Sequence, residues 1–289
     1  MKRILITGEN SYIGGKFTEW VAQWPEKYLV DELSVRGNHW KEISFKKYDV
    51  ILHVAAIVHQ KETKENLDLY YRVNRDLAYK LAKKAKEEGL TQFILMSTMN
   101  VYGINSGIIT EKTVCDPKTA YGKSKLEAER LVNSLQDDNF SVAIIRPPMV
   151  YGPDTVGNYV RLSQIAKVSP IFPKVRNKRS MIYINNLTEF IRLLIEKNQS
   201  GIFFPQNSEY ISTVSLVQEI SKIHNKAIYT TKLFNPLFKL LRRTNIIEKV
   251  FGNLVYDHKI SNIYDEEGNK LDYQIVDFIE SVGLTEYGI

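Results

Sequence analysis

The stretch Arg3-Ile4-Leu5-Ile6-Thr7, followed by Gly8-Glu9-Asn10-Ser11-Tyr12-Ile13-Gly14-Gly15, decides the fold of this chain. The first five residues predict a short buried strand, and the glycine-rich turn leads into a helical pattern that Pro25 ends. Gly8 permits a tight turn, Gly14 allows the helix to pack closely on the strand, and the helix N-terminus attracts phosphate. This order of elements is typical of a dinucleotide-binding unit.

The turn departs from the usual glycine pattern at its middle position, which is Ser11. Serine brings a Cβ to the place where the cofactor normally approaches, although its hydroxyl is itself able to bind phosphate. Taken alone, the segment also fits an ordinary strand–turn–helix unit. The residues here that we expect to contact a cofactor are Gly8, Asn10, Ser11, Tyr12, Ile13 and Gly14.

A second strand pattern, Asp49-Val50-Ile51-Leu52-His53-Val54-Ala55-Ala56, ends in small side chains. Small residues at the carboxyl end of a strand let a flat ring or a ribose lie against the backbone. We therefore expect the end of this strand to bind the cofactor through His53, Val54, Ala55 and Ala56.

The segment Tyr121-Gly122-Lys123-Ser124-Lys125 places a phenol and an ammonium one helical turn apart, on one face of a helix. A free tyrosine titrates near ~10, and an adjacent cation favours its phenolate, which suits proton exchange nearer neutral pH. On its own the pair also fits a solvated helix face, because both residue types are common on helices.

Six motifs occur in order along the chain. They are Thr-Gly-x-x-Ser-x-x-Gly from Thr7, His-Val-Ala-Ala from His53, Val-Asn-Arg-Asp from Val73, Ser-Thr-Met-Asn-Val-Tyr-Gly from Ser97, Tyr-Gly-Lys-Ser-Lys from Tyr121, and Arg-Pro-Pro-Met-Val-Tyr-Gly-Pro from Arg146. Together they resemble an extended short-chain dehydrogenase/reductase of the nucleotide-sugar epimerase/dehydratase family, over roughly residues 1 to 230.

The resemblance implies roles for several side chains. Tyr121 is the general acid/base at a sugar hydroxyl or carbonyl, and Lys125 lowers its pKa and binds the nicotinamide ribose. Thr98 donates a hydrogen bond to the same sugar oxygen, and Ser97 is the second candidate. Asn74 holds the sheet backbone near the cofactor. The further cofactor contacts expected are Ser97, Tyr121, Lys125 and Pro147.

The residues after Thr98 separate the members of this family. Sugar 4,6-dehydratases carry an Asp-Glu pair there, whereas this chain has Met99 and Asn100, which cannot shuttle protons. What remains is a nucleotide-sugar C4 epimerase or a 4-keto reductase, which we expect to serve surface polysaccharide biosynthesis. The alternatives are a non-catalytic NAD(P)-binding sensor or scaffold of the same fold, and a reductase of a non-nucleotide alcohol or ketone.

The choice between NAD and NADP depends on where the second strand ends. This strand lies near Tyr28 to Arg36. NAD selection needs a carboxylate about 20 residues past the turn, and NADP needs an arginine. Counting from Gly14 reaches Ser34, with Arg36 just beyond, which favours NADP. If the strand ends earlier, Glu32 takes that position and NAD is favoured.

Strand patterns alternate with helical patterns, which predicts a doubly wound parallel α/β sheet of the Rossmann type. We expect a dinucleotide-binding domain at residues 1–150, a re-entrant segment near 180–200, and a smaller interleaved substrate lobe within 151–289. Residues 234–243 are a candidate basic amphipathic helix, packed over that lobe rather than on a membrane. A homodimer fits the resemblance.

Charge and composition limit the remaining functions. The 289 residues carry a net charge of +6, yet no nucleic-acid-binding or zinc pattern occurs. The basic run that Arg179 ends suits a sugar diphosphate, so the expected substrate-binding residues are Met99, Asn100, Asn158, Arg161 and Arg179. The single cysteine, Cys115, and the lack of a signal-peptide core or long apolar run favour the cytoplasm.

Overall fold

The computed structural model describes residues 1–58, 62–63, 65–233, 248 and 251–288. The candidate basic helix at residues 234–243 lies outside the described residues. No helix in the described ranges is long and apolar enough to cross a membrane.

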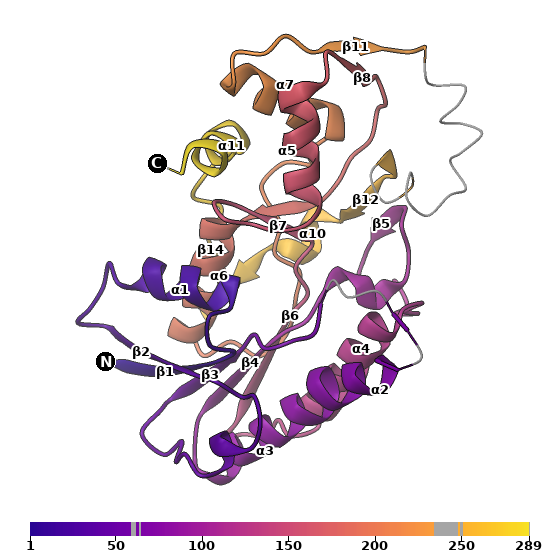
Figure 1. Cartoon of the computed structure of the whole chain (residues 1–289). Helices are drawn as coiled ribbons and strands as arrows, with labels where there is room; N and C mark the ends of the chain where they lie inside the picture. The colour runs from indigo at the N-terminus through magenta and orange to yellow at the C-terminus, as the bar shows by residue number, and fades with distance from the viewer. Residues whose placement is uncertain (59–61, 64, 234–247, 249–250, 289) are drawn as a thin grey trace.

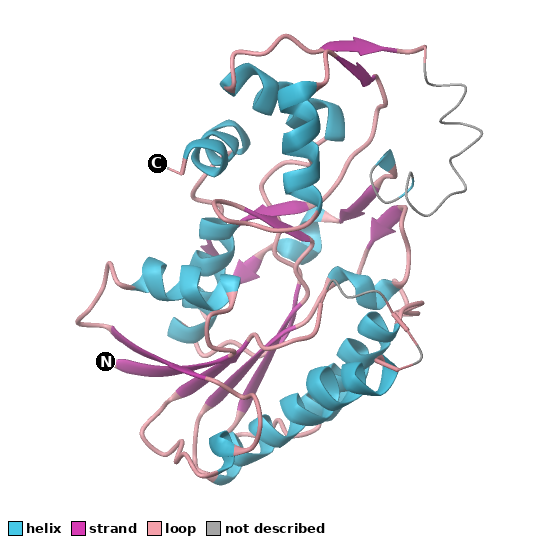
Figure 2. Cartoon of the chain, viewed as in Figure 1, coloured by secondary structure: helices cyan, strands magenta, loops and turns pink. Residues whose placement is uncertain are grey.

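A six-stranded parallel sheet forms the centre of the larger part of the molecule (Figures 1 and 2). In spatial order its strands are β10 (Gly201–Phe203), β6 (Ser141–Ile145), β4 (Gln92–Met96), β3 (Val50–His53), β1 (Lys2–Thr7) and β2 (Tyr28–Leu33). The chain runs from β1 to β2 on one side and then to β3 on the other. Ligands bind at such a reversal, beyond the carboxyl ends of the strands. The predicted doubly wound sheet is confirmed.

Helices cover both faces of this sheet, as Figure 1 shows. On one face lie α1 (Tyr12–Val21) and α6 (Ile184–Glu196), which contact each other. On the other face lie α2 (Leu67–Tyr70), the π-helical turn η2 (Tyr71–Leu77), α3 (Ala78–Glu87) and α4 (Ala120–Asn133). Side chains of a strand alternate between faces. Ile4 and Ile6 accordingly join the core with Phe17, whereas Leu5 packs in a second core with Leu81.

The rest of the chain builds a smaller lobe, drawn above the sheet in Figure 1. Its helices are α5 (Asn158–Val168), α7 (Thr213–Ile223), α10 (His258–Ser261) and α11 (Phe278–Tyr287). Four strand pairs complete it: β7 (Met149–Tyr151) with β9 (Met181–Tyr183), β5 (Gly107–Ile109) with β12 (Leu254–Tyr256), β8 (Ile171–Pro173) with β11 (Tyr229–Thr231), and β13 (Ile263–Tyr264) with β14 (Lys270–Leu271). Because α6 and β10 return to the first sheet, the chain passes between the two parts more than once.

Candidate active site

The glycine-rich turn between β1 and α1 allows very close backbone packing. Gly8 has a φ of +128°, and a Cβ added there would lie 2.8 Å from the backbone nitrogen of Ala55. A Cβ on Gly14 would lie 2.9 Å from Cγ2 of Ile6, which is the close helix–strand contact expected from the sequence. The Ser11 hydroxyl accepts the backbone N–H of Gly14 at 3.3 Å and so caps α1.

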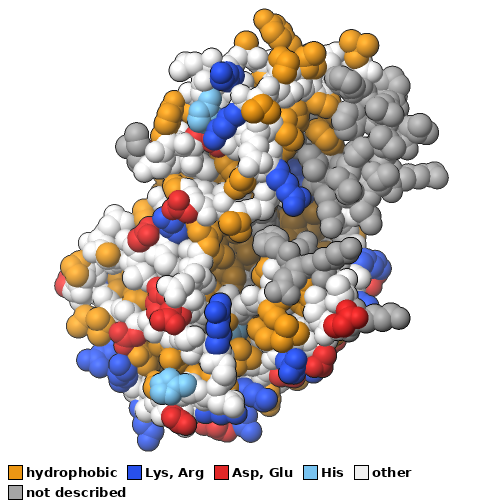
Figure 3. All heavy atoms as spheres, in the orientation of Figure 1, with side chains coloured by type: hydrophobic (Ala, Val, Ile, Leu, Met, Phe, Trp, Pro, Cys, Tyr) orange, Lys and Arg blue, Asp and Glu red, His pale blue; other side chains and the backbone are white. Residues whose placement is uncertain are grey.

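A cavity of about 830 Å³ opens beside this turn, at the point where the strand order reverses. Figure 3 shows the hollowed surface between the two parts of the molecule. Predicted residues that line the cavity are Gly8, Asn10, Ser11, Arg36, Val54, Ala55 and Ala56. Ser34, which the count from Gly14 reached, lines it too, and sequence reasoning missed Glu9, Val35, Gly37, Asn38, Trp40, Lys41, Ile57, Val58, Arg72, Val73, Leu77 and Lys80. Most of these follow a strand or lie along η2 and α3, so only the three-dimensional fold brings them to the turn.

Cations dominate the charged lining of the cavity. Arg36, Lys41, Arg72 and Lys80 carry positive charge, and Glu9 is the acidic lining residue. Arg72 pairs with Asp68 at 2.8 Å, whereas no ion pair joins Arg36 to another described residue. The cavity therefore offers several cations to an anionic group.

The end of β2 decides the register on which the cofactor prediction depends. The strand continues to Leu33, one residue past Glu32, and Ser34 and Arg36 follow it into the cavity lining. Glu32 is not among the lining residues, and its carboxylate accepts the backbone N–H of Asn10 at 3.0 Å. Arg36 thus lines the cavity and Glu32 does not, and the choice between NADP and NAD stays a prediction.

The other residues expected to bind the cofactor lie outside the cavity lining: Tyr12, Ile13, Gly14, His53, Asn74, Ser97, Tyr121, Lys125 and Pro147. His53 is fully buried in β3, where its Nδ1 lies 2.8 Å from the Thr7 hydroxyl and its ring stacks on Phe93. Burial, with a contribution from the charge of Lys125, lowers the pKa of His53 to about 3, so the ring is neutral at physiological pH. Tyr12 and Ile13 pack instead against the core next to α1.

Asn74 ties the end of β3 to the neighbouring helices. It is fully buried in η2, its carbonyl accepts the N–H of Ile57 at 2.8 Å, and its amide donates to the Ile57 carbonyl at 3.2 Å. The same amide donates to the Ser124 hydroxyl at 3.1 Å. Since Ile57 lines the cavity, these contacts match the implied role of holding backbone beside a cofactor.

Thr98 and Tyr121 meet next to the end of β4. Tyr121 lies in the first turn of α4, which Thr119 caps by accepting the N–H of Gly122 at 3.1 Å. Burial raises the pKa of Tyr121 to about 12, and a hydrogen bond with Thr98 opposes the increase. We expected an adjacent cation to lower this pKa, but burial outweighs every other influence on the phenol. With this pKa the phenol of Tyr121 keeps its proton at neutral pH.

Lys125 lies one turn further along α4 and is 1% exposed. Its Nζ donates to the Met96 carbonyl at 2.8 Å. Burial lowers the pKa of Lys125 to about 8, and the negative charge of Glu129 opposes the decrease. The ammonium thus lies at the carboxyl end of β4, on the same helix as Tyr121.

The residues around Thr98 have separate local partners. The Ser97 hydroxyl donates to the buried Glu129 carboxylate, so this hydroxyl points into the protein. Thr98 caps the short 3₁₀ helix η3 (Met99–Tyr102), in which Met99 is buried and Asn100 is exposed. The Met99 N–H donates to the Pro147 carbonyl at 3.0 Å, which places the buried Pro147 beside the same segment.

The candidate substrate residues of the smaller lobe lie on two elements. Asn158 and Arg161 are exposed in the first turns of α5, whereas Arg179 is partly buried and its Nη1 donates to the Gly252 carbonyl at 3.2 Å. Burial lowers the pKa of Arg179, and no carboxylate within the described ranges forms an ion pair with it. A partly buried guanidinium of this kind favours an anionic partner.

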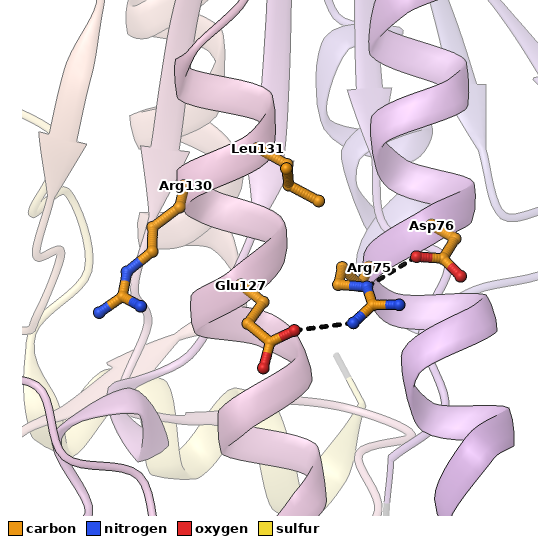
Figure 4. Close-up of a pocket in the computed structure, with 5 residues that line it drawn as sticks. All are labelled: Arg75, Asp76, Glu127, Arg130 and Leu131. Atoms are coloured by element: carbon orange, nitrogen blue, oxygen red, sulfur yellow. Dashed lines mark hydrogen bonds and ion pairs between the residues drawn. The ribbon is translucent and has the colours of Figure 1, made fainter.

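A second depression of about 400 Å³ lies on the outer surface between η2 and α4 (Figure 4). Its charged groups are paired with each other, because Arg75 contacts Asp76 at 2.6 Å and Glu127 at 2.8 Å. Arg130 and Leu131 complete the lining. None of the predicted site residues lines this depression, so it is separate from the candidate active site.

The doubly wound sheet with a cavity at its strand reversal, and Thr98, Tyr121 and Lys125 near the end of β4, are the features of an extended short-chain dehydrogenase/reductase. Within this class, the chain belongs to the NAD dependent epimerase/dehydratase family, whose model matches residues 4–203. The fold and the residues that carry the resemblance lead to the same family.

Relatives and solved structures agree with this assignment. The chain is 29% identical to UDP-glucose 4-epimerase of Vibrio cholerae, over 89% of this chain and 87% of that protein. It is 26% identical to N-acetyl-alpha-D-glucosaminyl-diphospho-ditrans,octacis-undecaprenol 4-epimerase of Escherichia coli O157:H7, over 81% and 76%. The fold is similar to that of UDP-glucuronic acid 4-epimerase from Bacillus cereus in complex with NAD (TM-score 0.72, 18% identity, 98% and 95% covered). It is also similar to dTDP-4-dehydrorhamnose reductase from Bacillus anthracis in complex with NADP (TM-score 0.65, 22% identity, 80% and 83% covered).

The buried lysine generates a prediction about stability. The Lys125 pKa is about 8 in the folded chain against an ordinary 10.5, so between these pH values the unfolded chain binds the additional proton. The free energy of unfolding of the wild type should therefore rise relative to Lys125→Met from pH 8 to 10.5, by up to about 1.4 kcal/mol per pH unit. Urea unfolding over pH 7 to 10.5 measures this difference.

The matched control is Lys123→Met, because Lys123 is exposed on the same helix. Its stability profile should run parallel to that of the wild type. A Lys125→Met profile that is also parallel to the wild type would show that the lysine keeps its ordinary pKa in the fold.

Proposed function

We propose that this protein is an NADP-dependent oxidoreductase acting at C4 of a nucleotide-linked sugar, and that it works as a 4-keto reductase. The observation that carries the proposal is the cationic cavity lining beyond β2, where Ser34 and Arg36 follow the strand. A 2′-phosphate needs such cations, whereas a ribose 2′-hydroxyl needs a carboxylate. The nearest candidate carboxylate, Glu32, binds the N–H of Asn10 instead.

The residues of the crevice fit a nicotinamide dinucleotide. The absence of a Cβ at Gly8 leaves room against Ala55, and the N-terminus of α1 lies next to the turn, where it favours a pyrophosphate. When bound, the cofactor supplies or accepts the hydride. The protein must then orient the sugar carbon and provide or remove one proton.

Tyr121 and Thr98 are suited to this proton transfer. The pKa of Tyr121, raised to about 12, keeps the phenol protonated at neutral pH, and in a reduction it gives that proton to the sugar oxygen at C4. Thr98, which is hydrogen-bonded to Tyr121, holds the same oxygen. The ammonium of Lys125 binds the nicotinamide ribose and favours the phenolate that remains. Dehydration lacks its proton carriers, because Met99 and Asn100 follow Thr98.

The proposed substrate is a UDP-linked hexose or N-acetylhexosamine, or its 4-keto-6-deoxy derivative. Arg179 supports this choice, since it is partly buried and has no described carboxylate partner for its charge. The Escherichia coli relative is named for a sugar on undecaprenyl diphosphate, which supports a role in surface polysaccharide synthesis. A cytoplasmic location and a homodimer complete the proposal.

A 4-epimerase is the second candidate, and the 29% identity with the Vibrio cholerae UDP-glucose 4-epimerase favours it. An epimerase oxidises and reduces the same carbon, so it consumes no cofactor. Incubation with UDP- and TDP-sugars, with and without NADPH, separates the two reactions. A reductase oxidises NADPH in proportion to an added keto sugar, whereas an epimerase interconverts C4 isomers without added cofactor. If neither reaction occurs while NAD(P) binds, the non-catalytic alternative is favoured.

The proton-transfer role of Tyr121 can be tested by Tyr121→Phe. Removing the hydroxyl should lower turnover about 10²–10⁴-fold and leave the affinity for the cofactor nearly unchanged, because the ring still fills its place. Stopped-flow or steady-state assays with the active sugar, combined with cofactor titration, measure both effects. Near wild-type turnover in the variant would exclude Tyr121 as the acid/base.

The role of Arg36 can be tested by Arg36→Ala. The loss of a charged hydrogen bond to a 2′-phosphate should weaken NADPH binding by about 1–3 kcal/mol, with little effect on NADH. Fluorescence titration with both cofactors measures the difference, and Arg130→Ala, an exposed arginine on α4, is the control. Equal losses of affinity for the two cofactors would show that Arg36 does not bind the 2′-phosphate.

The role of Arg179 can be tested by Arg179→Ala. Loss of the guanidinium should raise KM for the nucleotide sugar, because a diphosphate contact disappears, and should leave NADPH binding unchanged. Arg176→Ala is the control, since Arg176 is exposed three residues earlier. If the two variants have the same KM, Arg179 does not hold the diphosphate.

A further inference from the structure

A buried ion pair is connected to both ends of the short segment that carries Thr98. The Ser97 hydroxyl, at the start of this segment, donates to the Glu129 carboxylate. At the other end, Nη1 of Arg146 donates to the Tyr102 hydroxyl at 2.8 Å. Glu129 and Arg146 themselves are joined through the guanidinium Nε and Nη2, at 2.6 to 3.2 Å.

The ion pair is anchored in the elements that surround the site. Glu129 is 3% exposed and lies on α4, one turn after Lys125 and two turns after Tyr121. Arg146 is 6% exposed and directly follows β6. The hydroxyl of Tyr256, on β12, donates to the Arg146 carbonyl at 2.8 Å. The pair therefore joins α4, β6 and the smaller lobe at one point.

Between its two ends, the segment is held closely around Thr98. The N–H of Ser97 donates to the Ile145 carbonyl at 2.7 Å, and the N–H of Met99 donates to the Pro147 carbonyl at 3.0 Å. Both neighbours of Thr98 are thus bonded to the residues on either side of Arg146, which directly follows β6. The segment held in this way carries the Thr98 hydroxyl, which is hydrogen-bonded to Tyr121.

Stability alone does not explain this arrangement. Burying two charges costs several kcal/mol of desolvation, and a well-packed apolar pair of similar volume is often as stable. What charged, multiply bonded groups add is a defined geometry, because their hydrogen bonds are strong and directional. Such a pair is therefore suited to orienting the groups that bond to it, which here are the side chains of Ser97 and Tyr102 on either side of Thr98.

We propose that Glu129 and Arg146 are positioning residues that hold residues 97–102 at both ends and so set the Thr98 hydroxyl against Tyr121. The inference rests on the proposed function, in which Thr98 and Tyr121 share one sugar oxygen. The ion pair has no contact with the substrate in this scheme. Its effect passes through Ser97 on one side and Tyr102 on the other.

Two small substitutions test the proposal without leaving a charge unpaired. Ser97→Ala and Tyr102→Phe each remove one connection and keep the Glu129–Arg146 pair. The chain offers matched controls: the Ser163 hydroxyl donates to Glu286 at 3.0 Å, and the Tyr28 hydroxyl accepts from Arg192 at 3.1 Å. Ser163→Ala and Tyr28→Phe therefore make the same chemical changes next to other ion pairs, away from Thr98.

Both test variants should lower kcat about 10- to 100-fold, the effect of a small misplacement of a reacting group, with KM for NADPH and NADPH affinity unchanged. The primary isotope effect on kcat with NADPH deuterated at C4 should increase, because the chemical step becomes slower. Amide hydrogen exchange should become faster at residues 97–103 and should stay unchanged in α4 and β6. The control variants should retain kcat and exchange, even where their melting temperatures fall.

The outcomes separate the inference from the proposed function. The positioning role is overturned if Ser97→Ala and Tyr102→Phe keep the kcat and the amide exchange rates of the wild type. A loss of NADPH affinity in Ser97→Ala would also overturn it, because such a loss indicates a direct contact between Ser97 and the cofactor. If the wild type turns over no nucleotide sugar, the proposed function fails. The exchange rates at residues 97–103 still decide whether the pair holds the segment.

Discussion

The parallel pairing of β1 with β3 is the constraint on which the candidate site depends. In this register Thr7 lies opposite His53, and the Thr7 carbonyl accepts the N–H groups of Val54 and Ala55 at 3.1 and 3.0 Å. The turn at Gly8 then lies so close to Ala55 that no Cβ fits between them. The cavity forms beside this contact, because the chain leaves β1 in one direction and returns to β3 from the other.

Local sequence signals predicted the features that depend on short-range geometry. The requirement for glycine at positions 8 and 14 follows from a strand that turns directly into a helix, and both positions leave no room for a Cβ. The count from the turn reached residues that line the cavity, Ser34 and Arg36, because β2 keeps an extended conformation through Leu33. Asn74 was identified through the resemblance, and its contacts with Ile57 agree with the implied role.

Features that depend on burial or on long-range contacts could not be predicted in the same way. The spacing of Tyr121 and Lys125 placed both groups on one helix, but it could not show that burial is the largest influence on each pKa. The direction of the His53 side chain could not be predicted either, because a buried parallel strand is apolar on both faces and its pattern does not tell them apart. Glu129 and Arg146 are 17 residues apart in sequence, and only the packing of α4 against β6 brings them together.

Burial displaces the pKa values of the two central groups in opposite directions. The pKa of Tyr121 is raised to about 12 and that of Lys125 is lowered to about 8, so each charged form is less favourable than in water. A phenol that keeps its proton suits the step in which a sugar oxygen gains one, which is the reductive direction. The cost of the phenolate left behind falls when a cation lies nearby. Because Glu129 opposes the decrease in the Lys125 pKa, the same carboxylate that holds Ser97 also helps to keep that cation charged.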